Sequence, residues 1–449
     1  MVACMSNPTV NPAHSYHVAL RTMADGTLKQ VNPFSGTEVW TVPGRGNRPL
    51  TAASAPPEPL GPGAHTDTCN FCEARKLRTP PEKSRLVVDG EGFAILRDAM
   101  PDELDNTVAE FRRVPNLFEI VSYDYWQKNY GYEMPVARRS HMERYLADPA
   151  GREHVLQIVR TRLDAAGQDP DRPEDELLEL APAYFGGGHD VIIGRRHFVD
   201  GAENSAQLAG SGSLTPEEHY RFIAFTVDSL RDLVEQHTYA RYVVVFQNWL
   251  SPAGASFEHL HKQLVAIDEH GLQNEFEIAQ VRQNANMYNE WAVDYASRHN
   301  LVIAENDHAI AFAGFGHRWP TLEVFSKSAT TEPWLMADAE RDGVADLVHA
   351  CHIAAGPSIP CNEEWLHRPL DIDVPMPWRI VIKWRVSKMA GFEGGTKIFI
   401  NTLSPADLKD RVLPELLTAR EEGRLAPGIK LGDECDFAPN KLKYNPAIR

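Results

Sequence analysis

The amino-acid sequence predicts an α+β fold made of two related halves. A series of short strand-like segments is followed by a long helical segment, and this succession occurs twice along the chain. The composition, 43% hydrophobic and 24% charged over 449 residues, is that of a folded globular protein. The order of the predicted elements then divides the chain into the regions described next.

We expect an N-terminal half that is interrupted by an insertion, followed by a C-terminal half. The expected regions are a lead-in at 1–31, the N-terminal half with the active site at 32–119 and 182–270, a mostly helical insertion at 120–181, the C-terminal half at 271–425 and a tail at 426–449. The insertion is helical because Val155, Ile158, Val159 and Leu163 recur at helical spacing. It is either a lid that determines acceptor specificity or a peripheral decoration.

The N-terminal half contains short strand candidates and one well-marked helix. Its predicted strands are Glu38–Val42, Arg85–Val88, Phe93–Leu96, Asp190–Ile193, Arg241–Gln247 and Phe257–Ile267. The helix begins after Thr215, because Pro216 suits the first turn and Glu218 completes a capping box.

The C-terminal half repeats this pattern of strands and a helix. Its predicted strands are Ala309–Ala313, Thr321–Phe325, Arg379–Val386 and Lys397–Asn401. A helix then opens at Ser404 and ends near Gly423. Tryptophans of this half, among them Trp319, are expected in the core.

Charge and composition exclude several classes of function. With 62 acidic and 45 basic residues, the net charge of −17 disfavours nucleic acid or an anionic membrane as the main partner. No apolar run approaches the roughly 18–20 residues that span a bilayer. The first residues lack the pattern of a signal peptide, and six cysteines are too few for a disulfide framework, so we expect a cytoplasmic protein.

The most informative segment holds two histidines and a glutamine at alternate positions. On a strand, His259, His261 and Gln263 project from one face, while Leu260 and Leu264 point into the core. Such an H-x-H pair alone leaves a metal-binding and a structural interpretation equally open. Upstream, the spacing of Cys69 and Cys72 is typical of metal or redox chemistry. 

Six motifs, in order along the chain, resemble those of one enzyme family. They are Asn32-Pro33-Phe34-Ser35-Gly36 with Pro43–Pro49, Cys69-Asn70-Phe71-Cys72, Val114–Phe118, Gly188–Ile193 followed by His197, Gly254-Ala255-Ser256 followed by H-x-H-x-Q, and Gly391–Thr396. The family is that of galactose-1-phosphate uridylyltransferase in the histidine-triad superfamily, with the ADP-glucose phosphorylase and diadenosine tetraphosphate phosphorylase types. The resemblance implies two histidine-triad-like halves, each an antiparallel sheet with a packed helix, and a homodimer.

The resemblance also implies roles for individual residues. His261 matches the histidine that attacks the α-phosphorus of a nucleotide. Gln263 matches a residue that hydrogen-bonds a phosphoryl oxygen but delivers no proton, which suits leaving groups that need none. The positions matched to substrate contacts are Arg45, Arg48, Asn116, Asn248, Ser256 and Glu393. For the two arginines, a solvated surface loop is the alternative interpretation.

Metal binding follows from the same resemblance. The ligands of a structural zinc ion are matched by Cys69, Cys72, His197 and His259. The alternative is a pair of buried free thiols. A second metal site of some relatives is expected to be lost, because Glu277 and His367 match only two of its four ligands, and Pro377 and Arg379 stand at the other two positions.

Three functions stay open from the sequence. The first is transfer of a nucleoside monophosphate, through a nucleotidyl-histidine, between a sugar nucleotide and a phosphate-bearing acceptor. The second is phosphorolysis or hydrolysis of a dinucleoside polyphosphate or nucleotide sugar, and the third is a non-catalytic, zinc-stabilised nucleotide-binding protein. The sequence does not identify the base, the sugar or the acceptor.

Overall fold

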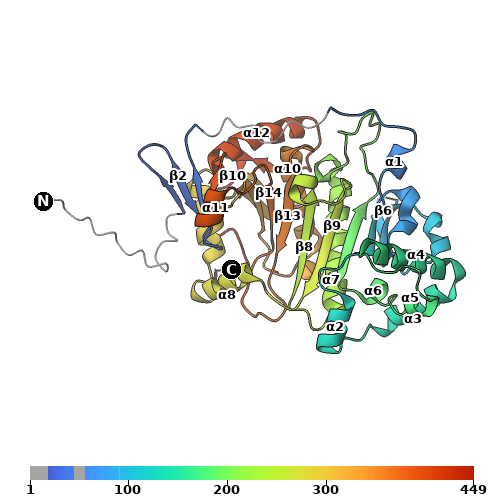
Figure 1. Cartoon of the computed structure of the whole chain (residues 1–449). Coiled ribbons are helices and arrows are strands. Elements are labelled where there is room, and N and C mark those ends of the chain that lie inside the picture. The colour runs from blue at the N-terminus through green and yellow to red at the C-terminus, as the bar shows by residue number, and fades with distance from the viewer. Residues whose placement is uncertain (1–18, 45–55, 91, 449) are drawn as a thin grey trace.

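The centre of the molecule is one large antiparallel sheet (Figure 1). The computed structural model describes residues 19–44, 56–90 and 92–448. Within these residues the sheet has 12 strands in the order β16-β10-β11-β12-β14-β13-β8-β9-β7-β6-β4-β5. Their bounds are β4 Ser84–Asp89, β5 Gly92–Arg97, β6 Ala109–Pro115, β7 His189–Gly194, β8 Tyr242–Trp249, β9 His261–Ile267, β10 Val302–Glu305, β11 Ala309–Ala313, β12 Thr321–Ser326, β13 Cys361–Leu366, β14 Arg379–Trp384 and β16 Lys430–Leu431.

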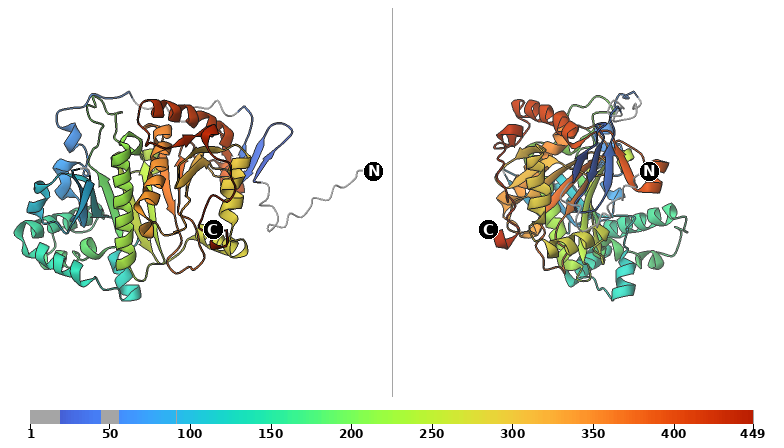
Figure 2. Two further views of the ribbon diagram at one scale, coloured as in Figure 1. Left: turned by 180° about the vertical axis from the view of Figure 1, so that it is seen from behind. Right: turned by 90° about the vertical axis from the view of Figure 1, so that its left-hand side faces the viewer.

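The strand order divides this sheet into two halves of the same topology. β8 and β13 pair at the centre, and β9, β7, β6 and β4 on one side match β14, β12, β11 and β10 on the other. In each half a long helix precedes the central strand: α7 (Pro216–Gln236) connects β7 to β8, and α10 (Asp338–Ala355) connects β12 to β13. The two helices contact each other on one face of the sheet (Figure 2). The prediction of an α+β fold with two related halves is confirmed.

The helix predicted after Ser404 is present, but it is not the counterpart of the long helix of the N-terminal half. The helix that matches α7 is α10, whereas the predicted helix at 404–422 is α12 (Pro405–Glu421) and follows a strand of another sheet. The segment of α10 is alanine-rich and buried over most of its last three turns. It therefore lacks the alternation of apolar and polar positions that marks an amphipathic helix in a sequence.

A second, smaller sheet lies at the end of the C-terminal half. Its order is β1-β2-β3-β15, and β15 runs parallel to β3. The bounds are β1 Leu20–Thr22, β2 Leu28–Val31, β3 Glu38–Thr41 and β15 Ile398–Asn401. Residues 20–31, expected as a lead-in, thus form two strands. The expected tail also packs on the fold, since β16 pairs with β10 and Tyr444 is buried.

The insertion consists of helices with a hydrophobic core of their own (Figure 1, lower right). Its helices are α2 Tyr123–Tyr130, α3 Val136–Ala147, α4 Pro149–Ala165, α5 Glu174–Leu178 and α6 Ala183–Gly186. Within the predicted helical insertion, residues 136–165 form two helices, α3 and α4, because the Asp148 side chain accepts the Gly151 N–H and Pro149 starts a new helix.

The remaining helices are short or cover the C-terminal half. They are α1 Ala64–Asp67, α8 Leu272–Gln283, α9 Asp294–Arg298 and α11 Gly391–Thr396. Among the helices of the described residues, none has the length and apolar character that crossing a membrane requires.

Candidate active site

The predicted nucleophile lies at the first residue of β9, on the sheet face opposite the long helices. The strand starts at His261, four residues later than expected, so His259 lies in the preceding loop. The His261 Nδ1–H donates to the His259 carbonyl at 2.8 Å, which leaves Nε2 with its lone pair. Only 4% of His261 is exposed, and this burial lowers its pKa. A neutral imidazole with a free Nε2 is the nucleophilic form near pH 7.

Aromatic rings cover this histidine on the open face. The ring of Phe71, in the loop between the two cysteines, lies 5.2 Å from the His261 ring and 4.4 Å from that of Phe257. On the opposite face, Lys262 is fully buried against Glu363, so it points away from the nucleophile as expected. The predicted core positions Leu260 and Leu264 are buried too.

Gln263 is held by two side chains from neighbouring segments. Its Oε1 accepts a hydrogen bond from His189 Nε2 at 3.0 Å and another from Asn116 Nδ2 at 3.2 Å. The Ile120 N–H donates to His189 Nδ1, which places the proton on Nε2 of that ring. Because both acceptor positions of Oε1 are used, the amide N–H groups of Gln263 are left to donate to a ligand.

The sequence predicted Asn116 as a substrate contact, not as a partner of Gln263, and gave His189 no role. His189 lies in the motif Gly188–Ile193, which was recognised in the sequence. Its role depends on the pairing of β7, the strand that contains it, with β9. Without knowing which strands are neighbours, the sequence cannot show that an imidazole on β7 contacts a glutamine on β9.

Asn248 is oriented by a residue from the other half of the molecule. Asn362 on β13 donates from Nδ2 to Asn248 Oδ1 at 2.7 Å and to the Ala253 carbonyl at 2.8 Å. Arg385 in turn donates to Asn362 Oδ1. A cavity of about 420 Å³ is lined by Asn248, Asn362 and Arg385. Sequence reasoning missed Asn362 and Arg385, because the pairing of β8 with β13 was not predicted.

Four further predicted positions lie apart from this network or outside the described residues. Ser256 is exposed in the loop before β9. The Glu393 carboxylate accepts the N–H groups of Ala390 and Ile400, so it caps α11, which lies far from β9 (Figure 1). Arg45 and Arg48 lie outside the described residues.

All four predicted metal ligands come together in one cluster. The two Sγ atoms of Cys69 and Cys72 are 3.9 Å apart, and each lies 3.5–3.8 Å from Nδ1 of His197 and of His259. Ligands of a tetrahedral zinc, at about 2.3 Å for sulfur and 2.0–2.1 Å for nitrogen, lie roughly 3.4–3.8 Å apart. The His259 Nε2–H donates to the Gly194 carbonyl at 2.6 Å, so the ring is oriented with Nδ1 toward the cluster.

At the positions matched to a second metal site of some relatives, a side-chain cation lies beside Glu277. Arg379 makes two hydrogen bonds to the Glu277 carboxylate, at 2.5 and 2.8 Å, and the Tyr288 hydroxyl donates to the same group at 2.7 Å. The two ring nitrogens of His367 lie within hydrogen-bond distance of backbone carbonyls, Nδ1 of that of Arg368 and Nε2 of that of Val243. Arginine therefore supplies the positive charge beside Glu277.

Comparison with known proteins agrees with the fold and the motifs. A family described as a domain of unknown function (DUF4921) matches residues 23–444. The chain belongs to this family. Galactose-1-phosphate uridylyltransferase of Thermotoga maritima is 26% identical to it over 212 residues, which is 42% of this chain and 64% of that enzyme. The match thus spans less than two thirds of the curated relative.

Two solved structures share the fold of this DUF4921 protein. An ADP-glucose phosphorylase from Arabidopsis thaliana with bound ADP-glucose has a TM-score of 0.56 at 17% identity and covers 86% of this chain and 98% of its own. A GalT-like protein of the same plant has a TM-score of 0.51 at 18% identity, with coverages of 78% and 92%. The resemblance to the galactose-1-phosphate uridylyltransferase-like family is confirmed.

Proposed function

We propose that this protein is a nucleotidyltransferase that acts on nucleotide sugars through a nucleotidyl-His261 intermediate. The observation that carries the proposal is the hydrogen bond from His261 Nδ1 to the His259 carbonyl, which leaves Nε2 as the nucleophile. The oriented amide of Gln263 lies two residues further along the same strand. The curated relative is a uridylyltransferase, and a structural neighbour binds ADP-glucose.

The chemistry needs two displacements at one phosphorus atom. In the first, Nε2 of His261 forms a bond to the α-phosphorus, and the bond to the leaving phosphate oxygen breaks, so sugar 1-phosphate departs with the electron pair. In the second, a phosphate oxygen of the acceptor attacks, and the N–P bond breaks to restore the imidazole. Neither leaving group needs a proton, which is consistent with a glutamine at position 263.

The N–H groups of Gln263 and Asn248 suit the non-bridging oxygens of the transferred phosphoryl group. Charge that develops on these oxygens in the transition state is stabilised by donors that are already oriented. Gln263 is oriented by His189 and Asn116, and Asn248 by Asn362. We propose that Ser256, in the loop before β9, adds a hydroxyl donor to the same oxygens.

We also propose that the cysteine–histidine cluster holds a structural zinc ion. Two thiolates and two imidazoles fill a tetrahedral shell, so no position remains for a substrate. A zinc ion bound there would hold the Cys69–Cys72 loop, with Phe71, against the start of β9. The ion would thereby position His261 and help to exclude water from it.

Inorganic phosphate as the acceptor would make the same chemistry a phosphorolysis. The structural neighbour described as an ADP-glucose phosphorylase favours this second candidate. The two candidates share the first displacement and differ only in the second, so product analysis with phosphate or with a sugar 1-phosphate separates them.

Covalent labelling tests the proposal directly. Wild-type protein is incubated with UDP-glucose or ADP-glucose carrying ³²P at the α-phosphorus, and the denatured protein is counted. We expect label that is stable in alkali and lost in acid, and that leaves the protein on adding sugar 1-phosphate or phosphate. The control H308N, at a histidine on the loop between β10 and β11, should label like wild type. Absence of label with both substrates, or equal label on H261N, would refute the proposal.

A further inference from the structure

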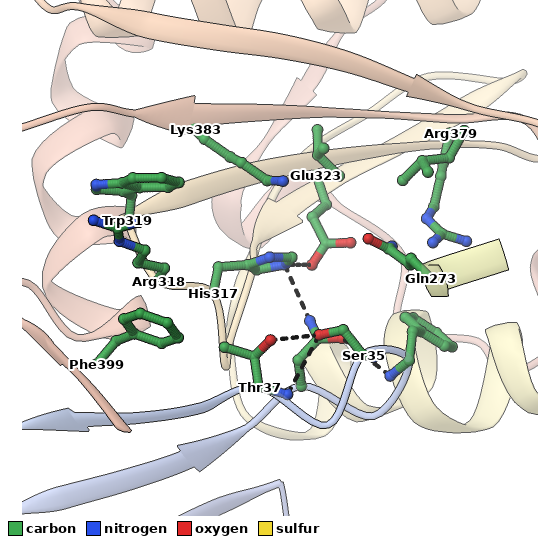
Figure 3. A pocket seen from close by; sticks show the side chains of 14 residues that line it. Ser35, Thr37, Gln273, His317, Arg318, Trp319, Glu323, Arg379, Lys383 and Phe399 are labelled. Atoms are coloured by element: carbon green, nitrogen blue, oxygen red, sulfur yellow. Dashed lines mark hydrogen bonds and ion pairs between the residues drawn. The ribbon is translucent and has the colours of Figure 1, made fainter. Parts of the chain in front are cut away.

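A second cavity lies on the open face of the C-terminal half and encloses about 220 Å³ (Figure 3). Strands β12 and β14 line one side, and the turn at residues 32–37, one of the sequence motifs, lines the other. Leu366 lines this cavity and also the cavity beside Asn248, so the two are neighbours. No described residue of the proposed catalytic or metal-binding set lines it.

One of the three cations in this cavity has no neutralising carboxylate. Lys383 pairs with Glu364 at 2.6 Å, and Arg379 is paired with Glu277. No ion pair within 4 Å involves Arg318 in the described parts of the chain; its guanidinium carbon lies 4.2 Å from the ring centre of Trp319 instead. In a protein of net charge −17, an arginine left unpaired at a cavity is available to bind an anion.

A second arginine stacks on the same indole from the neighbouring cavity. The guanidinium carbon of Arg385 lies 4.1 Å from the Trp319 ring centre, and the repulsion from Arg318 acts on it. Its Nε is buried and has no hydrogen-bond partner among the described residues. Trp319, expected in the core, is in fact half-buried between the two cavities. An anion beside these two arginines would relieve their repulsion.

The rest of the lining offers donors and acceptors around flat apolar rings. His317 and the buried Glu323 carboxylate are paired at 2.8 Å, and the hydroxyls of Ser35 and Thr37 lie 2.8 Å apart. Trp319 and Phe399 form the apolar side (Figure 3). A pyranose ring has hydroxyls at its rim, which need both donors and acceptors, and C–H faces that pack on aromatic rings.

We propose that this cavity is a second ligand site, which binds a sugar phosphate. The phosphate lies at Arg318 with Arg385 close by, the sugar ring packs on Trp319, and its hydroxyls reach Glu323 and the Ser35–Thr37 pair. The volume is below the about 300–1,000 Å³ of sites for drug-sized ligands, so it suits one phosphorylated sugar rather than a nucleotide sugar. This site is separate from the proposed catalytic site, since neither His261 nor Gln263 lines it.

Titration calorimetry on the full-length protein tests this site. The titrants are glucose 1-phosphate, glucose 6-phosphate, glucose and inorganic phosphate, and the background is the double variant H261N/Q263A, which disables the proposed catalytic row. We expect a sugar phosphate to bind this double variant, and R318Q to weaken that binding about tenfold or more, because a charge-assisted hydrogen bond is lost. The matched control R411Q, at an exposed arginine on α12, should bind like its parent.

A second variant covers the case in which R318Q does not fold. S35F should fill the cavity without removing the arginine, and it should abolish binding while the melting temperature stays near that of its parent. The proposal is overturned if no sugar phosphate binds the double variant at millimolar concentration, or if R318Q and S35F both bind like R411Q. Binding of phosphate or glucose alone as tightly as the sugar phosphate would also contradict it. A failure of His261 labelling leaves this measurement unaffected.

Discussion

The two halves of the large sheet share a topology but present different side chains on their equivalent strands. β9 and β14 both lie next to the central pair, and both show alternate residues on the open face. β9 presents His261 and Gln263 there, whereas β14 presents Arg379, Val381 and Lys383. One backbone arrangement thus presents the proposed nucleophile in one half and a cation-lined cavity in the other. The fold is the scaffold, and the side chains decide the chemistry.

On the helix-covered face, by contrast, the halves are joined by buried charges. Lys262 of the N-terminal half pairs with Glu363 of the C-terminal half, and His352 on α10 lies 2.7 Å from the same carboxylate. Burial alone would raise the pKa of Glu363, but Lys262 and His352 hold it below its usual range. The open face therefore distinguishes the two halves, and the covered face makes them one folding unit.

The largest effect on stability is expected from removing one proposed metal ligand in the N-terminal half, compared with removing a buried free thiol in the C-terminal half. C72A should lose its zinc and most of the about 10 kcal/mol or more that such ions contribute in structural sites, because three ligands hold the ion poorly. C351A, at a buried free thiol on α10, should keep zinc and lose only about 1 kcal/mol. Zinc content by mass spectrometry and thermal melting measure both effects. If wild type purified without chelators holds no zinc, the cluster is a thiol pair.

Breaking the buried ion pair should destabilise both halves together. K262M leaves the Glu363 carboxylate buried without its lysine, with only the His352 ring and the Trp365 indole N–H as partners, so we expect a loss of about 3 kcal/mol, measured by urea unfolding. In wild type the lowered pKa of Glu363 contributes stability above about pH 4, and this is lost as the pH falls. In K262M the carboxyl pKa is raised, so the variant should approach wild type on acidification. If K262M is as stable as wild type at pH 7, the Lys262–Glu363 pair does not stabilise the contact between the two halves.

The sequence predicted what depends on neighbours along the chain. The capped helix after Thr215 follows from local sequence, and the four metal ligands follow from the family resemblance; the structure contains the helix and places these ligands together. The predicted strand row keeps His261 and Gln263, whereas His259 lies in the loop before β9. The sequence did not predict contacts between strands that are distant in sequence. Asn362 meets Asn248 only because β13 pairs with β8. The roles of Arg45, Arg48 and Ser256 stay predictions.

Loss of the contact between Asn362 and Asn248 should lower the rate of the reaction more than it lowers the stability of the protein. N362A frees the Asn248 amide to turn, so we expect kcat/KM of nucleotidyl transfer to fall about tenfold, the cost of one misplaced donor to phosphate. E364Q, two residues along the same strand, should stay within about twofold and serves as the control. If N362A and wild type have equal kcat/KM values, the C-terminal half does not orient the proposed catalytic site.

The smallest effect is expected where two donors share one acceptor. Oε1 of Gln263 accepts from both His189 and Asn116, so removal of either donor leaves the other to hold the amide. N116A should therefore lower kcat/KM only about threefold, and H189A should do the same, whereas N362A leaves the Asn248 amide only its long 3.5 Å contact with the Gly254 carbonyl. The double variant N116A/H189A should lose more than the product of the two single effects, because the amide is then free to turn its oxygen toward the phosphate. Strict additivity would mean that the two donors act independently, and that Gln263 is oriented by something other than this pair.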